Sequence, residues 1–226
     1  LPALLRGIPL PNFGIWEPFI RTRALCLNAL TSWHKELWEE NFASSMKEDS
    51  WSQDHEGLAP DFFKNLTSTW QRNDALRTDL ERRQALLELD VLTSLALGLT
   101  LEELLTCYRL GFRVMRSYDE DTYYDQKGRI VFTSNGNGLR GVGLSRKATA
   151  EDSETYAVNG SLQEKGLGFE DVKEMDTGTV SRTFMDDTLP GGPISRTIVY
   201  KAPFFKMNRE EDYRRAWTFF SALKKE

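Results

Sequence analysis

The sequence predicts an α+β fold: a helical N-terminal half, a small irregular β region and a C-terminal helix. Three observations support this class. Apolar residues recur at helical spacing up to about residue 112, short β-like runs replace them after Tyr118, and helical spacing returns near the C-terminus. Strands and helices do not alternate along the chain, which disfavours a repeating βαβ fold.

The N-terminal third predicts two helices separated by a loop. Residues 1–14 are rich in proline and are expected to be extended. Apolar residues at spacings of three to five then predict a helix over about 16–42. Residues 43–60 are polar and end in glycine and proline, so we expect a loop before a second helical stretch over 61–70.

The strongest helical signal runs over about 76–97. One face of a 3.6-residue period carries four apolar side chains, Leu80, Leu87, Val91 and Leu95. Gly98 ends this helix. Thr100 and Glu103 have the spacing of a capping box, which predicts that another helix begins at about residue 101 and continues to 112.

The β region begins with a predicted hairpin over 123–133, whose turn lies at 125–128. Short strands are predicted over 179–184 and 197–200, and a turn around 190–193 joins them. The final helix is defined by two capping residues and four apolar ones, namely Asn208, Glu211, Tyr213, Trp217, Phe220 and Leu223.

A chain of 226 residues is long enough for one large domain or two small ones. We divide it into a mainly helical region, 1–118, and a region with the hairpin, a Gly-rich loop and the C-terminal helix, 119–226; one domain overall is the alternative. The chain begins at Leu1 in apolar, proline-punctuated sequence, so we expect it to be part of a longer protein.

The sequence predicts a cytoplasmic protein that does not span a membrane. The chain has no secretory signal pattern and no apolar run approaching ~18 residues. Cys26 and Cys107 lie far apart in sequence, each within an apolar helical context. We therefore predict two buried free thiols and no disulfide.

A basic block interrupts an otherwise acidic chain, whose formal net charge is −5. Between positions 127 and 147 there is no acidic residue, and five are basic: Lys127, Arg129, Arg140, Arg146 and Lys147. Arginine and lysine, together with the exposed backbone amides of a Gly-rich loop, suit the phosphates of a nucleic acid. We predict that these five residues bind nucleic acid, with a solvated loop as the alternative.

The sequence contains no complete set of residues for a catalytic centre. Gly136, Gly138 and Gly141 match a dinucleotide-binding pattern, but no helix is predicted to begin at the last glycine, where the pyrophosphate would lie. His34 and His55 are the only histidines, and no zinc-ligand spacing occurs. We predict no catalytic residue, metal site or cofactor site in this chain and leave open whether it is an enzyme.

Three clusters of acidic residues are candidate metal sites. They lie at 119–121, 170–171 and 186–187. Asp171 and Lys173 imitate part of a nuclease motif, so a stand-alone nuclease is a third hypothesis. Surface charge is the simpler interpretation of all three clusters.

Several segments resemble one protein family, and together they span nearly the whole chain. They are residues 9–23, 76–79, 83–86, 88–92, 97–104 (LGLTLEEL) with 108–109, 124–133 (YDQKGRIVFT), 141–144 (GVGL), 182–193 (RTFMDDTLPGGP) and 202–206 (APFFK). The pattern is similar to the C-terminal region of large bacterial, mainly actinobacterial, adenine-specific DNA methyltransferases of restriction–modification and phage-defence systems.

The resemblance implies that chemistry belongs to another part of the parent enzyme. In such enzymes an upstream domain binds S-adenosylmethionine and carries an Asn-Pro-Pro-Tyr motif, whereas this chain contains no Asn-Pro-Pro. The resemblance then implies recognition of double-stranded DNA. The alternative is a protein-interaction module whose helical region, 16–112, docks defence-system subunits or the parent's catalytic domain.

Overall fold

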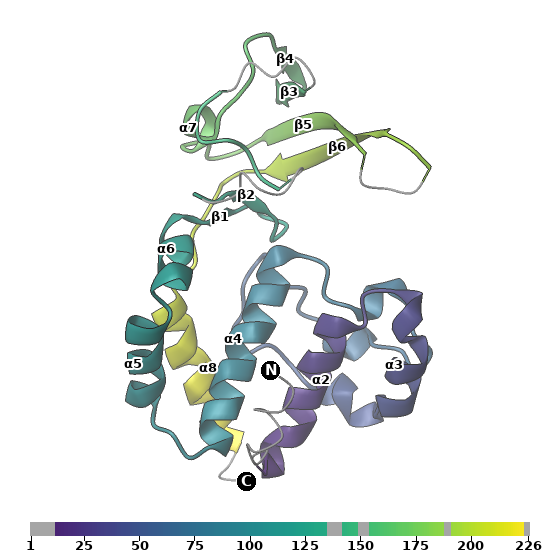
Figure 1. Cartoon of the computed structure of the whole chain (residues 1–226), viewed down its shortest axis with the longest axis vertical. Helices are drawn as coiled ribbons and strands as arrows, with labels where there is room; N and C mark the ends of the chain where they lie inside the picture. Colours follow the sequence, from purple (N-terminus) through teal and green to yellow (C-terminus); the bar gives the residue numbers. More distant parts are fainter. Residues whose placement is uncertain (1–11, 135–141, 149–153, 188–190, 224–226) are drawn as a thin grey trace, which may run out of the picture.

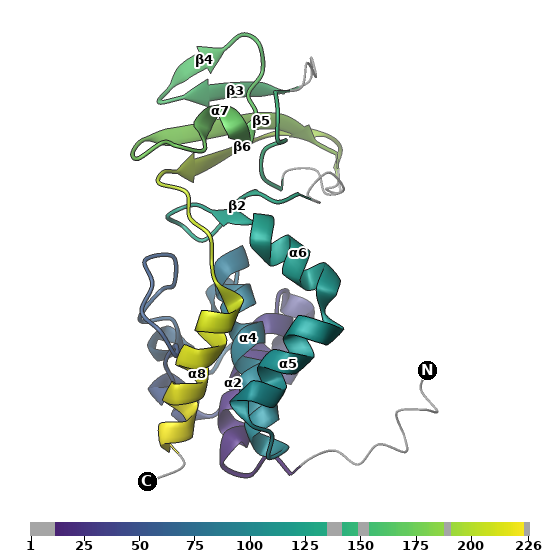
Figure 2. The same cartoon turned by 90° about the vertical axis from the view of Figure 1, so that its left-hand side faces the viewer.

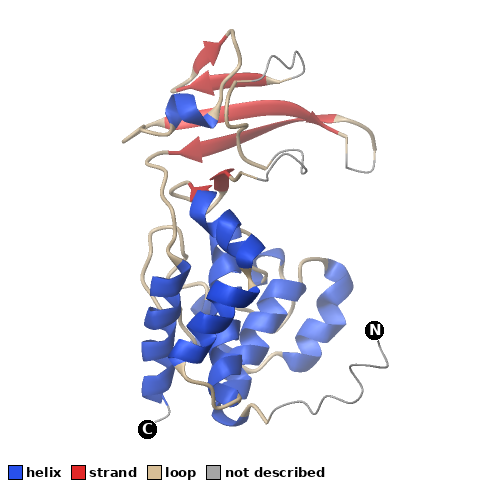
Figure 3. Cartoon of the chain, turned by 60° about the vertical axis from the view of Figure 1, so that its left-hand side comes forward, coloured by secondary structure: helices blue, strands red, loops and turns tan. Residues whose placement is uncertain are grey.

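The structure is a computed structural model that describes residues 12–134, 142–148, 154–187 and 191–223. It has the predicted α+β fold. The larger helices gather in one part and a four-stranded sheet forms the other, with a short hairpin between them (Figures 1 and 3). No helix among the described residues has the length and apolar character needed to cross a membrane.

The helical part contains α-helices and short 3-10 turns. In chain order they are η1 (Gly14–Trp16), α2 (Glu17–Asn28), η2 (Ser32–His34), α3 (Lys35–Asn41), η3 (Ser44–Glu48), η4 (Phe63–Asn65), η5 (Arg72–Asp74), α4 (Asp79–Ala96), α5 (Leu101–Gly111), α6 (Arg113–Asp121) and α8 (Arg209–Leu223). Figure 2 shows α8 lying beside α4 and α5, although the whole sheet separates them in sequence.

Two antiparallel sheets follow α6. The elements are β1 (Tyr123–Tyr124), β2 (Ile130–Phe132), β3 (Thr155–Val158), β4 (Ser161–Gln163), α7 (Phe169–Val172), β5 (Thr179–Asp186) and β6 (Ile194–Lys201). Strands β1 and β2 form the predicted hairpin, and the larger sheet has the order β4–β3–β5–β6. Strands β5 and β6 pair along their whole length, from Thr179 opposite Lys201 to Asp186 opposite Ile194.

Helix α4 is the centre of the helical part. Its predicted apolar face is confirmed, because Leu80, Leu87 and Val91 are fully buried. The predicted capping box of α5 is also confirmed, since the Thr100 hydroxyl accepts a hydrogen bond from the Glu103 amide at 3.3 Å. Helix α8 packs on α4 and α5 through buried side chains that include Tyr213, Ala216 and Phe220.

A buried arginine joins three segments of the helical part. The Arg23 side chain on α2 is fully buried; its Nε donates to Glu88 on α4 at 2.6 Å, and its Nη1 donates to Asp49 at 2.6 Å. The guanidinium also lies over the rings of Phe63, at 5.2 Å, and of Phe220 on α8, at 5.0 Å. Burial raises the pKa of Asp49, and the charge of Arg23 opposes this shift.

The predicted single helix over 16–42 is wrong, because α2 ends at Asn28. Side chains from distant segments bind backbone carbonyls at and just after this helix end. Arg82 Nη1 donates to the Leu27 oxygen at 3.0 Å, and beyond the helix Trp70 Nε1 donates to the Ala29 oxygen and Arg77 Nη2 to the Leu30 oxygen, each at 2.8 Å. These contacts are tertiary, so local periodicity does not reveal them.

Three further expectations need correction. The helix predicted over 61–70 is only the turn η4, because the Asp74 carboxylate holds the amide and hydroxyl of Thr67 at 2.9 and 2.7 Å in a loop. Helix α6 and the β3–β4 pair, which lies within the polar stretch 145–170, were not predicted. Cys26 is buried as expected, but Cys107 is exposed.

We expect Arg23→Met to destabilise the protein by about 3–5 kcal/mol, because it leaves the carboxylates of Asp49 and Glu88 buried without a cation. Urea unfolding measures this change in free energy. The control is Arg21→Met, whose partner Glu17 is 54% exposed; it should cost about 0.5 kcal/mol or less. Equal midpoints and slopes for both variants would contradict the structural role of Arg23.

Candidate nucleic-acid interface

The hairpin at the beginning of the predicted basic block is held by one buried carboxylate. Asp125 is fully buried in the turn between β1 and β2. Its Oδ1 accepts hydrogen bonds from the amides of Lys127 and Arg129, each at 2.9 Å, and its Oδ2 accepts one from the Lys201 amide of β6 at 3.1 Å. The turn is therefore attached to the end of the long sheet.

The same turn rests on the first residues of α4. The amide of Leu80 donates to the Gly128 oxygen at 2.9 Å, and the amide of Ile130 donates to the Asp79 carboxylate at 2.9 Å. Gly128 has φ +73°, and a Cβ at this position would lie 2.8 Å from the Gly57 carbonyl oxygen. Only glycine fits here without strain. The hairpin consequently fixes β6 above the beginning of α4 (Figure 1).

A cleft of about 440 Å³ lies between the beginning of α4, strand β2 and strand β6. Four of its described lining residues are arginines, and we call it the arginine cleft: Arg72, Arg77, Arg129 and Arg196. Arg72 and Arg77 come from the segment before α4, Arg129 precedes β2, and Arg196 lies on β6. Four segments thus contribute lining residues to one site, since Val142 also reaches it.

The charges in the arginine cleft are poorly balanced. Among the described residues, no carboxylate forms an ion pair with Arg72, Arg77 or Arg129 within 4.0 Å, whereas Arg196 pairs with Asp186 at 3.1 Å. Asp79 is the single acidic residue among those that line the cleft. Burial, and then the neighbouring charges of Arg72 and Arg82, lowers the pKa of Arg77. Crowded cations of this kind favour a bound anion.

Backbone carbonyls hold some of these guanidinium groups in place. Arg77 donates to the oxygens of Arg72, at 2.7 and 2.9 Å, and of Leu30, at 2.8 Å. Arg129 donates to the Val199 oxygen of β6 at 3.1 Å. Hydrogen bonds to carbonyls orient a guanidinium group without cancelling its charge, so the cleft keeps its positive character.

The predicted residues occupy different places. Arg129 lines the arginine cleft, whereas Lys127 is exposed on the turn and Lys147 is exposed beyond β2; neither lines the cleft. Arg140 lies outside the residues that the structure describes. Arg146 pairs with Asp121 at 2.6 Å and lies over the ring of Phe132 at 4.8 Å.

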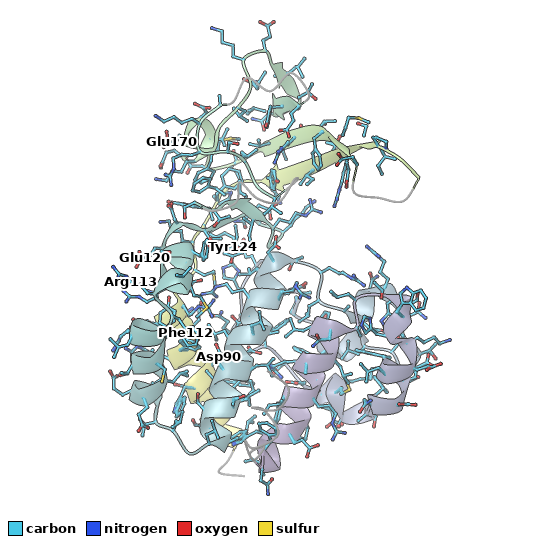
Figure 4. All side chains as sticks on the ribbon, viewed as in Figure 1. Asp90, Phe112, Arg113, Glu120, Tyr124 and Glu170 are labelled. Atoms are coloured by element: carbon cyan, nitrogen blue, oxygen red, sulfur yellow. The ribbon has the colours of Figure 1, made fainter. Side chains whose placement is uncertain are left out.

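Arg146 is surrounded by acidic groups. Besides Asp121, it has Glu170 at 3.9 Å, on the short helix α7 at the left of Figure 4. Its side chain is 51% exposed, so water screens both pairs. A phosphate at this position would compete with two carboxylates, which makes Arg146 a weaker anion site than Arg72 or Arg129.

Three cleft arginines were not among the predicted binding residues. Arg72 and Arg77 lie in a mixed-charge segment with no periodic signal, so only the folded chain identifies them. For Arg196, the sequence does contain an indication of a basic site. The segment 188–209 contains Arg196, Lys201, Lys206 and Arg209 and no acidic residue, which makes it a second basic block.

Metal-ligating side chains do not gather in the part of the chain that the structure describes. In those ranges, no group of three or more His, Cys, Asp or Glu side chains is placed to hold a metal ion. Asp119, from the first acidic cluster, accepts hydrogen bonds from Arg209 at 2.6 Å and from the Tyr108 hydroxyl at 3.0 Å. The glycines of the dinucleotide-like pattern, at 136–141, lie outside the described residues.

Comparisons with known proteins add no family to this picture. No protein-family model, curated protein or solved structure matches the chain.

We expect Gly128→Ala to destabilise the protein by about 2 kcal/mol or more, because alanine is strained at φ +73° and its Cβ would meet the Gly57 carbonyl. Thermal or urea unfolding measures the loss. Gly111→Ala is the matched control: it lies at the end of α5, and its added Cβ would have open space. Equal free energies of unfolding for the two variants would contradict the close packing of Gly128 against the Gly57 carbonyl.

Proposed function

We propose that this chain is the non-catalytic DNA-recognition portion of a bacterial adenine-specific DNA methyltransferase of a restriction–modification or phage-defence system. The observation that carries the proposal is the arginine cleft, where Arg72, Arg77 and Arg129 have no carboxylate partner among the described residues. The resemblance of the sequence to the C-terminal region of these enzymes supports the same conclusion.

Phosphate oxygens are the ligands that such a cleft would favour. Each bound phosphate would supply the negative charge that the cleft lacks, and arginine can bind it through two parallel hydrogen bonds. Contacts of this kind fix the position of a duplex and depend strongly on salt, while carrying little sequence information. The five sequence-predicted residues remain proposed DNA contacts, and Arg129 is the one that the cleft includes.

In this proposal methyl transfer belongs to the parent's upstream domain, which would bind S-adenosylmethionine. The present chain would position double-stranded DNA for that domain, in the cytoplasm. No step of the transfer is assigned to residues of this chain.

We expect Arg72→Glu combined with Arg129→Glu to lower duplex DNA affinity by about an order of magnitude or more at low salt. The slope of log K against log salt concentration should fall by about 1 for each phosphate contact removed. Fluorescence anisotropy of a labelled duplex, repeated at several salt concentrations, measures both. Neither side chain is buried, so the fold should be retained.

Lys47→Glu combined with Lys64→Glu is the control, because it changes the net charge equally and both lysines are exposed away from the cleft. It should leave the slope nearly unchanged. An unaltered slope in the arginine variant, or equal losses in both variants, would exclude the arginine cleft as the DNA site.

A second candidate function is docking of the parent's catalytic domain. Three large apolar side chains at the junction of α5 and α6 are exposed, and we call them the apolar ridge: Leu110 (78%), Phe112 (54%) and Val114 (67%). Helix α6 buries none of its residues completely. Figure 4 labels Phe112 and Arg113 near the place where α5 meets α6. Contiguous exposed apolar groups often mark protein interfaces.

We expect Phe112→Ser combined with Val114→Ser to weaken binding to the upstream catalytic domain, while duplex DNA binding stays unchanged. Isothermal titration of the two purified pieces measures the first, and anisotropy measures the second. The control is Trp33→Ser, which removes another exposed apolar side chain, 93% accessible, from a different surface. Retained affinity in the ridge variant would exclude this docking surface.

A further inference from the structure

A second depression continues from the arginine cleft. It has a volume of about 470 Å³, within the range of small-molecule sites, and lies between α4, α6 and the hairpin. Asp79, Ile130 and Val142 line both depressions, so the two are contiguous. We call the second one the apolar groove. Figure 2 shows α6 passing beside α4 beneath β2, where these elements meet.

The walls of the apolar groove are largely apolar and reach the surface. Leu86 on α4 is 52% exposed, and Tyr118 on α6 is 39% exposed. Met115 on α6 lines the same space. An accessible tyrosine ring beside aliphatic side chains is a surface on which a flat ring can stack, and every nucleobase has such a face.

The groove also has a polar component. Arg83 lines it and is 7% exposed. Its Nη1 donates to Asp212 at 2.8 Å, but its buried Nη2 has no hydrogen-bond partner among the described residues. The Asp119 carboxylate lines the same groove, and its Oδ1 lies 3.9 Å from Arg83 Nε. This end of the groove therefore offers both a donor and an acceptor side chain, and nucleobases carry donors and acceptors on their edges.

We propose that the apolar groove receives one unstacked nucleobase of a strand whose phosphates lie in the arginine cleft. This inference rests on the proposed DNA-binding function and names the form of DNA that the site selects. The contiguity of the two depressions carries it, because a phosphodiester chain places charged and flat aromatic groups side by side. A fully paired duplex would fill the arginine cleft and leave the groove empty.

The test compares three labelled duplexes of equal length: one fully paired, one with a single unpaired nucleotide, and one in which that nucleotide lacks its base. The intact protein should bind the unpaired nucleotide about 5- to 150-fold more tightly than its abasic counterpart, the range expected for one stacked base. Tyr118→Ala should abolish this ratio, and Tyr118→Phe should retain it. Both variants should bind the paired duplex like the original protein.

The outcomes separate the two proposals. Equal affinity for the unpaired and abasic duplexes overturns the base site and leaves DNA binding intact. A ratio that persists in Tyr118→Ala also overturns it, because the base would then lie elsewhere. Failure to bind any of the three duplexes overturns the proposed function itself. Circular dichroism and the melting temperature establish that the Tyr118 variants are folded.

Discussion

The attachment of the β1–β2 turn to both the end of β6 and the beginning of α4 is the constraint on which the arrangement of the molecule depends. The buried carboxylate of Asp125 accepts hydrogen bonds from backbone amides of its own turn and from the Lys201 amide at the end of β6. Gly128 lets the same turn approach α4 closely. A longer or more mobile connection would let the sheet move relative to the helices. Because the hairpin is held on both sides, β6 stays close to α4, and both the arginine cleft and the apolar groove follow from that position.

Arginine has two contrasting roles in this chain. Arg23 is buried, with Asp49 and Glu88 as partners, so its charge is neutralised within the fold. In the arginine cleft, Arg72 and Arg129 have no carboxylate partner among the described residues and face solvent. The same residue type therefore stabilises the helical part in one place and leaves a site for an external anion in another. Burial and the position of the nearest carboxylates make the difference.

Sequence reasoning succeeded where the relevant interactions are local. The apolar face of α4, the capping box at Thr100 and the hairpin turn at 125–128 all depend on residues within a few positions of one another. It failed where distant groups decide the outcome. Where α2 ends, side chains from 70–82 bind the carbonyls of Leu27, Ala29 and Leu30. The arginine cleft was only partly predicted, since Arg72 and Arg77 carry no sequence signal.

The α+β class, the central helix, the hairpin and the basic block can all be predicted from the order of residues, because periodicity, capping and turn preferences act over short distances. Tertiary structure alone decided which cations share a site. It paired Arg146 with Asp121 and brought Arg129 together with Arg72, 57 positions earlier by their residue numbers, and with Arg196. Charge acts through space, so the partner of each arginine is set by the fold and not by its neighbours in the chain.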